Sequence, residues 1–285
     1  ALLPVIDLTD LMRCGSDRLL SKSTRIESSV EQAARHLFRS TAPHILISGE
    51  SGVGKTSLVY QLAQKAAHGD PEFLTGSRFI SIDCCNVGVE DSRACLESII
   101  TTIFQLSGQI VLCVEGLANL LKRPNGGTNN PLLRAMLDRP DLRMIGVMSD
   151  WEFTEFVASD SRMLESFSRI EVSEPGNSET LKIVQQHATS LSQEFSLTIS
   201  KHVVSRTVAL ASSFILNECH PAKSIRLLRQ VCEDAEFDRT QLGQARDSIE
   251  LRQVVDAIAE KTGIPAETIG GEEGESDFDS ALRDA

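Results

Sequence analysis

The sequence predicts an α/β fold, in which a parallel β-sheet is flanked by helices and is followed by a small all-helical subdomain. Short apolar runs alternate with helical patterns through about the first 175 residues, as in βαβ units. After Glu174 and Pro175 helical patterns follow one another with no apolar strand between them. The composition, 41% hydrophobic and 24% charged, is that of a globular protein, and 285 residues can bury a sizeable core.

Five short segments are predicted to be strands. Each is rich in β-branched or other apolar residues, as strands buried on both faces are. Helical patterns separate them, so we expect an open parallel sheet covered on both faces. The predicted strands are residues 44–50, 78–83, 109–114, 142–148 and 169–172.

Helices are predicted from apolar spacing and from the residues that begin them. Residues 91–104 place Leu96, Ile99, Ile100 and Ile103 on one face, and Asn130 followed by Pro131 favours a helix start. We expect an α/β subdomain over residues 1–175, a helical subdomain over 176–237, and a linker, a connector helix and an acidic tail over 238–285. The predicted helices are residues 54–68, 91–104, 117–121, 130–138, 180–191, 201–216, 221–237 and 248–262.

Charge and cysteine usage exclude several classes of function. The formal net charge of -12 argues against general nucleic-acid binding, which needs a basic surface. No apolar stretch approaches the length of a membrane span, and the first residues do not resemble a signal peptide. The seven cysteines follow no disulfide or zinc spacing, which indicates reduced thiols and a cytoplasmic protein.

Residues 49–56 read G-E-S-G-V-G-K-T and fit the phosphate-binding pattern G-x-x-x-x-G-K-[ST] at every fixed position. The glycines let the backbone wrap round an anion, and the following helix directs its N-terminus at it. Lys55 would reach the β- and γ-phosphates, and the Thr56 hydroxyl would bind Mg²⁺. We therefore predict ATP or ADP with Mg²⁺, bound by Gly49, Glu50, Ser51, Gly52, Val53, Gly54, Lys55, Thr56 and Ser57.

Hydrolysis would also need an acidic metal ligand at the end of the third predicted strand and a second acid to deprotonate water. Glu115 follows that strand and is the candidate for the metal. The next residue is Gly116, which has no side chain to act as a base, and no other carboxylate follows closely in the sequence. Lys55 and Glu115 are thus the only catalytic candidates.

The chain resembles the first AAA+ module of the Clp unfoldases and disaggregases over most of its length. Residues 49–56 are similar to the Walker A loop of that family, and residues 109–121 to its Walker B strand and helix. Further similar segments are 6–9, which resembles the start of the module, 142–146 (sensor 1), 151–156 after it, 221–228 in the helical subdomain and 254–265, which resembles the connector to a second AAA+ module.

The chain departs from that family where hydrolysis and substrate handling need particular residues. Glu115 and Gly116 stand where the family has Asp and the catalytic Glu, and Ser149 is the only polar sensor-1 candidate. The arginine fingers fall on Glu165 and Ser166, with Arg162 and Arg169 nearby but off register. Residues 85–90 are too short for the aromatic pore loop, and the long coiled-coil insert is absent.

Three functions remain open. The first is an ATP-binding but hydrolysis-impaired module that serves assembly of a Clp-type ring or its regulation, with a second AAA+ module and a protein client as partners. The second is an active ATPase that unfolds proteins with an unrecognised base. The third is a scaffold or adaptor without nucleotide, against which the intact Lys55 and Thr56 count. A GTPase or kinase is disfavoured because no guanine-recognition motif is present.

The resemblance also implies an adenine pocket. Leu19, Leu20 and Ser21 align with the segment that contacts adenine, and Ile183 with residues 221–225 would close the pocket. All these apolar positions fit a hydrophobic core equally well. Lys223 and Arg226 are candidates for sensor 2, although ordinary solvated helix charges are the simpler interpretation.

Overall fold

The computed structural model describes residues 5–13, 24–40, 43–241 and 247–270, and it separates into two compact units. The first, here the α/β unit, comprises residues 1–50 and 54–173. The second, the helical unit, comprises residues 174–285 together with residues 51–53. The sequence predicts this change of architecture after residue 175. No helix of the described residues is long and apolar enough to cross a membrane.

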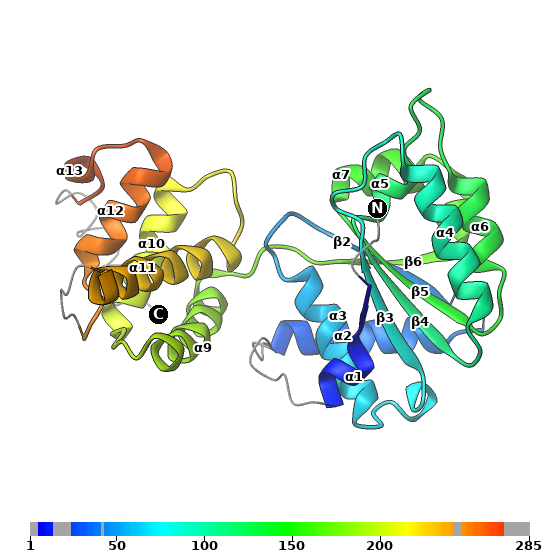
Figure 1. Ribbon diagram of the computed structural model, residues 1–285, viewed down its shortest axis with the longest axis horizontal. Helices are drawn as coiled ribbons and strands as arrows, with labels where there is room; N and C mark the ends of the chain where they lie inside the picture. The colour runs from blue at the N-terminus through cyan, green and yellow to red at the C-terminus, as the bar shows by residue number, and fades with distance from the viewer. Residues whose placement is uncertain (1–4, 14–23, 41–42, 242–246, 271–285) are drawn as a thin grey trace. The chain divides into compact units, whose positions relative to one another are not determined.

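The α/β unit is built on a six-stranded sheet in the order β1-β3-β4-β5-β2-β6, and the predicted α/β class is confirmed (Figure 1). The five predicted strands are all present and run parallel to one another. They are β2 (His44–Ser48), β3 (Arg78–Asp83), β4 (Ile110–Glu115), β5 (Leu142–Met148) and β6 (Phe167–Glu171).

One edge of the sheet differs from the prediction. β1 (Val5–Asp7) lies antiparallel to β3, so the sheet is mixed and not wholly parallel. A strand of three residues is too short to show an alternating pattern, so the sequence does not predict it.

Helices cover both faces of the sheet, as Figure 1 shows. α1 (Leu8–Arg13), α2 (Thr24–Phe38) and α3 (Lys55–Ala67) lie on one face. The opposite face carries α4 (Ser92–Gln105), α5 (Leu117–Leu121) and α6 (Asn130–Leu137). The remaining short elements are η2 (Glu72–Leu74), α7 (Asp150–Phe153), the π-helical η3 (Thr154–Ala158) and α8 (Ser161–Ser166).

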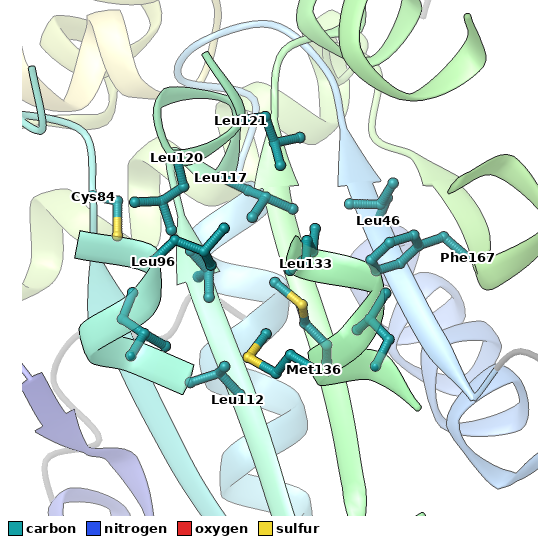
Figure 2. Close-up of a cluster of buried hydrophobic side chains, with 14 of the residues drawn as sticks. Leu46, Cys84, Leu96, Leu112, Leu117, Leu120, Leu121, Leu133, Met136 and Phe167 are labelled. Atoms are coloured by element: carbon teal, nitrogen blue, oxygen red, sulfur yellow. The ribbon is translucent and has the colours of Figure 1, made fainter. Parts of the chain in front are cut away.

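A dense apolar core fills the space between the sheet and the second group of helices (Figure 2). Leu46 and Leu112 point from the strands toward Leu117 and Met136 on the helices, and all four are buried. A Cβ on Gly146 in β5 would lie 2.5 Å from Leu46 Cδ2 and 2.6 Å from Leu117 Cδ2. Close packing therefore explains why a glycine occupies a central strand.

The helical unit has a core of its own. It contains α9 (Asn177–Phe195), α10 (Lys201–Phe214), α11 (Ala222–Gln241), α12 (Leu251–Thr262) and α13 (Ala266–Ile269). Val254 and Ile258 of α12 are fully buried in the same cluster as Leu228 of α11. Residues 251–269 thus belong to this packed unit, whereas the sequence predicts a helical subdomain that ends at residue 237, followed by a linker and a connector helix. The acidic residues from 271 onward lie outside the described residues.

His44, at the start of β2, is 3% exposed and fully hydrogen-bonded. Its Nδ1 accepts from the Met144 N–H at 3.2 Å, and its Nε2 donates to the Leu137 carbonyl at 3.2 Å. Nδ1 must therefore be unprotonated, which fixes the neutral tautomer. Burial lowers the pKa of His44 to about 4; the Leu137 carbonyl opposes this shift, Arg143 adds to it and Asp138 opposes it.

Because folded His44 is held in its neutral form, we expect the α/β unit to lose stability in mild acid. The unfolded chain takes up a proton near pH 6.5, whereas folded His44 stays neutral down to about pH 4. The contribution of His44 to the free energy of unfolding is therefore fully present above about pH 6.5. It is lost as the pH falls from there toward about 4, by up to about 1.4 kcal/mol per pH unit. Urea unfolding at several pH values, followed by fluorescence of Trp151, the only tryptophan, measures this slope. His44→Gln should flatten it, and an unchanged slope in that variant would contradict the assignment.

Candidate nucleotide-binding site

The phosphate-binding loop joins β2 to α3 at the carboxyl edge of the sheet. Gly49, Gly52 and Gly54 adopt φ values of 151°, 94° and 107°, a region that side chains disfavour. Gly54 is the N-cap of α3, so the unpaired N–H groups of the first helical turn lie beside the loop. Such a loop followed by a helix N-terminus is an anion-binding arrangement.

Lys55 folds back across this loop. Its Nζ donates to the carbonyl oxygens of Gly49 and Glu50, both at 2.8 Å. Burial lowers the pKa of Lys55, while the nearby carboxylates, led by Asp150, oppose the shift. These carboxylates favour the ammonium form of Lys55, and that form could meet the negative charge of a phosphate.

Thr56 and Glu115 lie in contact, although they are far apart in the sequence. The Thr56 hydroxyl, in α3, donates to Oε2 of Glu115, at the end of β4, and the two oxygens are 3.1 Å apart. Burial raises the pKa of Glu115; the hydrogen bond from Thr56 opposes this, Asp83 adds to it and Lys55 opposes it. A hydroxyl beside a carboxylate is an oxygen donor set that suits Mg²⁺, so these two residues fit the metal that the loop implies.

The chain is similar to known proteins of one family. Residues 45–149, from β2 to just past β5, match the AAA family, described as "ATPase family associated with various cellular activities". The chaperone protein ClpB of Rickettsia felis is 25% identical over 258 residues, which cover 86% of this chain and 29% of that protein. Heat shock protein 100 of Trypanosoma brucei brucei is 26% identical over 256 residues, with the same coverage. The chain contains a Clp-family AAA+ module.

The fold agrees with this assignment. The solved Hsp104–ADP complex of S. cerevisiae matches this AAA+ module with a TM-score of 0.78 and 24% identity. That match covers 98% of this chain and 48% of the Hsp104 chain. The chain spans about 29% of the length of the ClpB and heat shock protein 100 relatives.

Gly116 follows Glu115 in a conformation that only glycine adopts easily. Its φ and ψ are 66° and 36°, and it is the N-cap of α5. A Cβ at this position would lie 2.9 Å from both the Cα and the N of Cys85. Asn119 holds that turn in place, because its Nδ2 donates to the carbonyls of Cys84 and Cys85 at 3.1 and 2.9 Å. The backbone of the β3–α4 turn thus occupies the space into which a side chain at residue 116 would begin.

The sensor-1 candidate Ser149 has a structural role at the start of α7. Its Oγ accepts from the Glu152 N–H, and its own backbone N–H donates to Glu152 Oε2 at 2.9 Å, which completes a capping box. Lys122 Nζ lies 3.8 Å from the other oxygen of Glu152. Ser149 is therefore held by its own helix.

Three carboxylates near the loop, Asp83, Asp150 and Glu152, are not predicted as site residues from the sequence. The negative charges of Asp150 and Glu152 oppose the lowering of the Lys55 pKa by burial. The charge of Asp83 adds to the rise that burial causes in the pKa of Glu115. Each residue ends a strand or follows one closely, and the carboxyl ends of parallel strands meet at one edge. This position in the predicted strands was the signal that could have found them.

The two off-register arginines differ in their surroundings. Arg169 in β6 donates to Ser48 Oγ at 2.8 Å and to Asp150 Oδ1 at 2.7 Å, and it stacks 4.2 Å from the Phe153 ring centroid. These contacts hold Arg169 within its own α/β unit. Arg162 on α8 is exposed, as is Glu165 at one of the arginine-finger positions.

In the helical unit, the candidate residues take part in packing and ion pairs. Ile183 is 3% exposed in α9. Lys223 is also buried, and its Nζ donates to the Ile215 carbonyl at 3.0 Å, at the end of α10, so it is not a solvated helix charge. Arg226 pairs with Glu218 at 2.6 Å. Leu19, Leu20 and Ser21 lie outside the described residues.

Proposed function

We propose that this AAA+ module binds ATP with Mg²⁺ and hydrolyses it slowly or not at all, so that bound nucleotide serves ring assembly or regulation. The observation that carries the proposal is the pairing of a complete phosphate-binding loop with a blocked position at Gly116. Three glycines with positive φ, the ammonium of Lys55 and the Thr56–Glu115 contact support binding. The Gly116 conformation argues against a catalytic side chain.

Each bound group has a residue suited to it. The loop N–H groups and Lys55 would bind the phosphates, while Thr56 and Glu115 would hold Mg²⁺. Mg²⁺, when bound, neutralises charge on the β- and γ-phosphates. Residues 49–57 and Glu115 therefore form the proposed site.

Impaired hydrolysis follows from what surrounds that site. Loss of a general base typically lowers a rate about 10²- to 10⁴-fold. Loss of a trans-acting arginine lowers it about 10³- to 10⁵-fold, and Arg169 is committed to Ser48 and Asp150. These two effects together would bring turnover near the uncatalysed rate.

The relatives suggest what the bound nucleotide would control. Two solved Hsp104 structures are described as complexes with casein, one of them also with ATPγS. By analogy, we propose a ring formed with further copies of this chain or with other Clp-type subunits, a second AAA+ module and a protein client. A cytoplasmic location remains a prediction from the sequence.

Two measurements on the purified chain separate the three functions. Calorimetry with ATP and Mg²⁺ should show a heat of binding, and single-turnover assays with labelled ATP should show hydrolysis close to the uncatalysed rate. Hydrolysis well above that rate would instead indicate an active ATPase. The absence of any heat of binding with ATP and Mg²⁺ would indicate a scaffold that does not bind nucleotide.

A further inference from the structure

Asp83 is a carboxylate that the proposed site does not yet use. It is the last residue of β3 and is the direct register partner of Glu115 on β4. Adjacent strands lie about 4.8 Å apart, and register partners direct their side chains to the same face of a sheet. Asp83 and Glu115 therefore lie side by side at the carboxyl edge of the sheet.

The face that they share is the one covered by α3. Thr56, in the first turn of that helix, donates to Glu115. Tyr60 lies one turn further along the same helix. Three separate elements thus bring oxygen ligands together at one end of the phosphate-binding helix: β3 with Asp83, β4 with Glu115 and α3 with Thr56.

The turn that follows β3 orients the Asp83 carboxylate. Its Oδ1 accepts from the Cys85 N–H at 2.8 Å, and the side chain is exposed at the edge of the sheet. This bond fixes the rotation of the carboxylate. Accepting this hydrogen bond from the Cys85 N–H requires only one acceptor oxygen and no negative charge on residue 83.

We propose that Asp83 is a second carboxylate of the Mg²⁺–nucleotide site and acts beside Glu115 and Thr56, either directly or through a metal-bound water. The inference rests on the proposed nucleotide binding. Mg²⁺ in nucleotide sites is held by one or two carboxylates together with phosphates and retains several waters. A cation between Asp83 and Glu115 would also remove the repulsion between two adjacent negative charges.

Asp83→Asn tests this role while keeping the fold of the turn. The amide oxygen can still accept from the Cys85 N–H, whereas the negative charge is lost. Glu90→Gln is the matched control, because it removes one exposed charge from the same β3–α4 turn. ATP affinity is measured by calorimetry in Mg²⁺ and in EDTA, and Mn²⁺ binding in the presence of ATP is measured by electron paramagnetic resonance.

We expect Asp83→Asn to reduce the gain in ATP affinity due to Mg²⁺ by about 10-fold or more, the usual effect of losing an outer ligand of a metal. Its affinity in EDTA should be unchanged or slightly higher, and Glu90→Gln should match the wild type. The metal role would be overturned if Mg²⁺ raised the ATP affinity of Asp83→Asn as much as that of the wild type. It would also be overturned if the variant lost the same ATP affinity in Mg²⁺ and in EDTA. Either result would leave nucleotide binding intact. A wild-type chain that binds no ATP would refute both proposals.

Discussion

Replacing Gly116 with Glu is expected to destabilise the α/β unit and to leave ATP hydrolysis unrestored. A comparison of sequences alone would suggest the opposite, since this substitution supplies the missing catalytic acid. In the structure, a side chain at residue 116 meets two constraints. The φ of 66° is a left-handed conformation, and the Cβ would lie 2.9 Å from backbone atoms of Cys85, which cannot rotate away.

The expected loss of stability combines these two terms. A left-handed conformation costs a non-glycine residue about 1–2 kcal/mol, and overpacking in a close-packed region costs about 1–3 kcal/mol. Urea unfolding followed by Trp151 fluorescence should therefore show a loss of about 2–5 kcal/mol. Single-turnover hydrolysis should stay at the wild-type level.

Two alanine variants separate the terms. Gly116→Ala has both the left-handed φ and the contact with Cys85. Gly126→Ala has a similar φ of 73°, but no atom of the described residues lies within 4 Å of its added Cβ. Gly126→Ala should lose only about 1–2 kcal/mol, and the difference between the variants measures the contact with Cys85. A stable Gly116→Glu protein that hydrolyses ATP 100-fold or more above the wild type would contradict this account of the site.

Replacing Lys55 with Ala is expected to weaken ATP binding about 10- to 100-fold. The substitution removes charge-assisted hydrogen bonds to phosphate, each worth about 1.5–3 kcal/mol, and each 1.4 kcal/mol changes affinity tenfold. Folding should change little, because the Lys55 side chain is only half-buried and its acceptors in the loop, the Gly49 and Glu50 carbonyls, can turn to water. Calorimetry with ATP and Mg²⁺ measures the affinity.

Lys65→Ala is the matched control for the Lys55 variant. Lys65 lies in the last turn of the same helix α3, away from the loop, and its loss changes the net charge equally. The Lys65 variant should bind ATP like the wild type. Equal affinities for Lys55→Ala and Lys65→Ala would show that the loop is not where nucleotide binds.

The parts of the candidate site that could be predicted are those encoded by neighbouring residues in the sequence. The G-x-x-x-x-G-K-[ST] pattern encodes its own loop, because its glycines permit positive φ and its last residues begin a helix. The strand before Glu115 also has a local pattern. Asp83 was missed because its importance depends on the register between β3 and β4, which are joined only through α4.

By itself, the sequence determined the α/β class, the five parallel strands and the phosphate-binding loop. These features follow from apolar periodicity and from glycine chemistry, which act over a few neighbouring residues. The tertiary structure alone decided that β1 adds an antiparallel edge, that α12 joins the helical core and that the Cys85 backbone blocks residue 116. Each of these depends on contacts between segments far apart in the chain, and no local pattern of residues specifies such contacts.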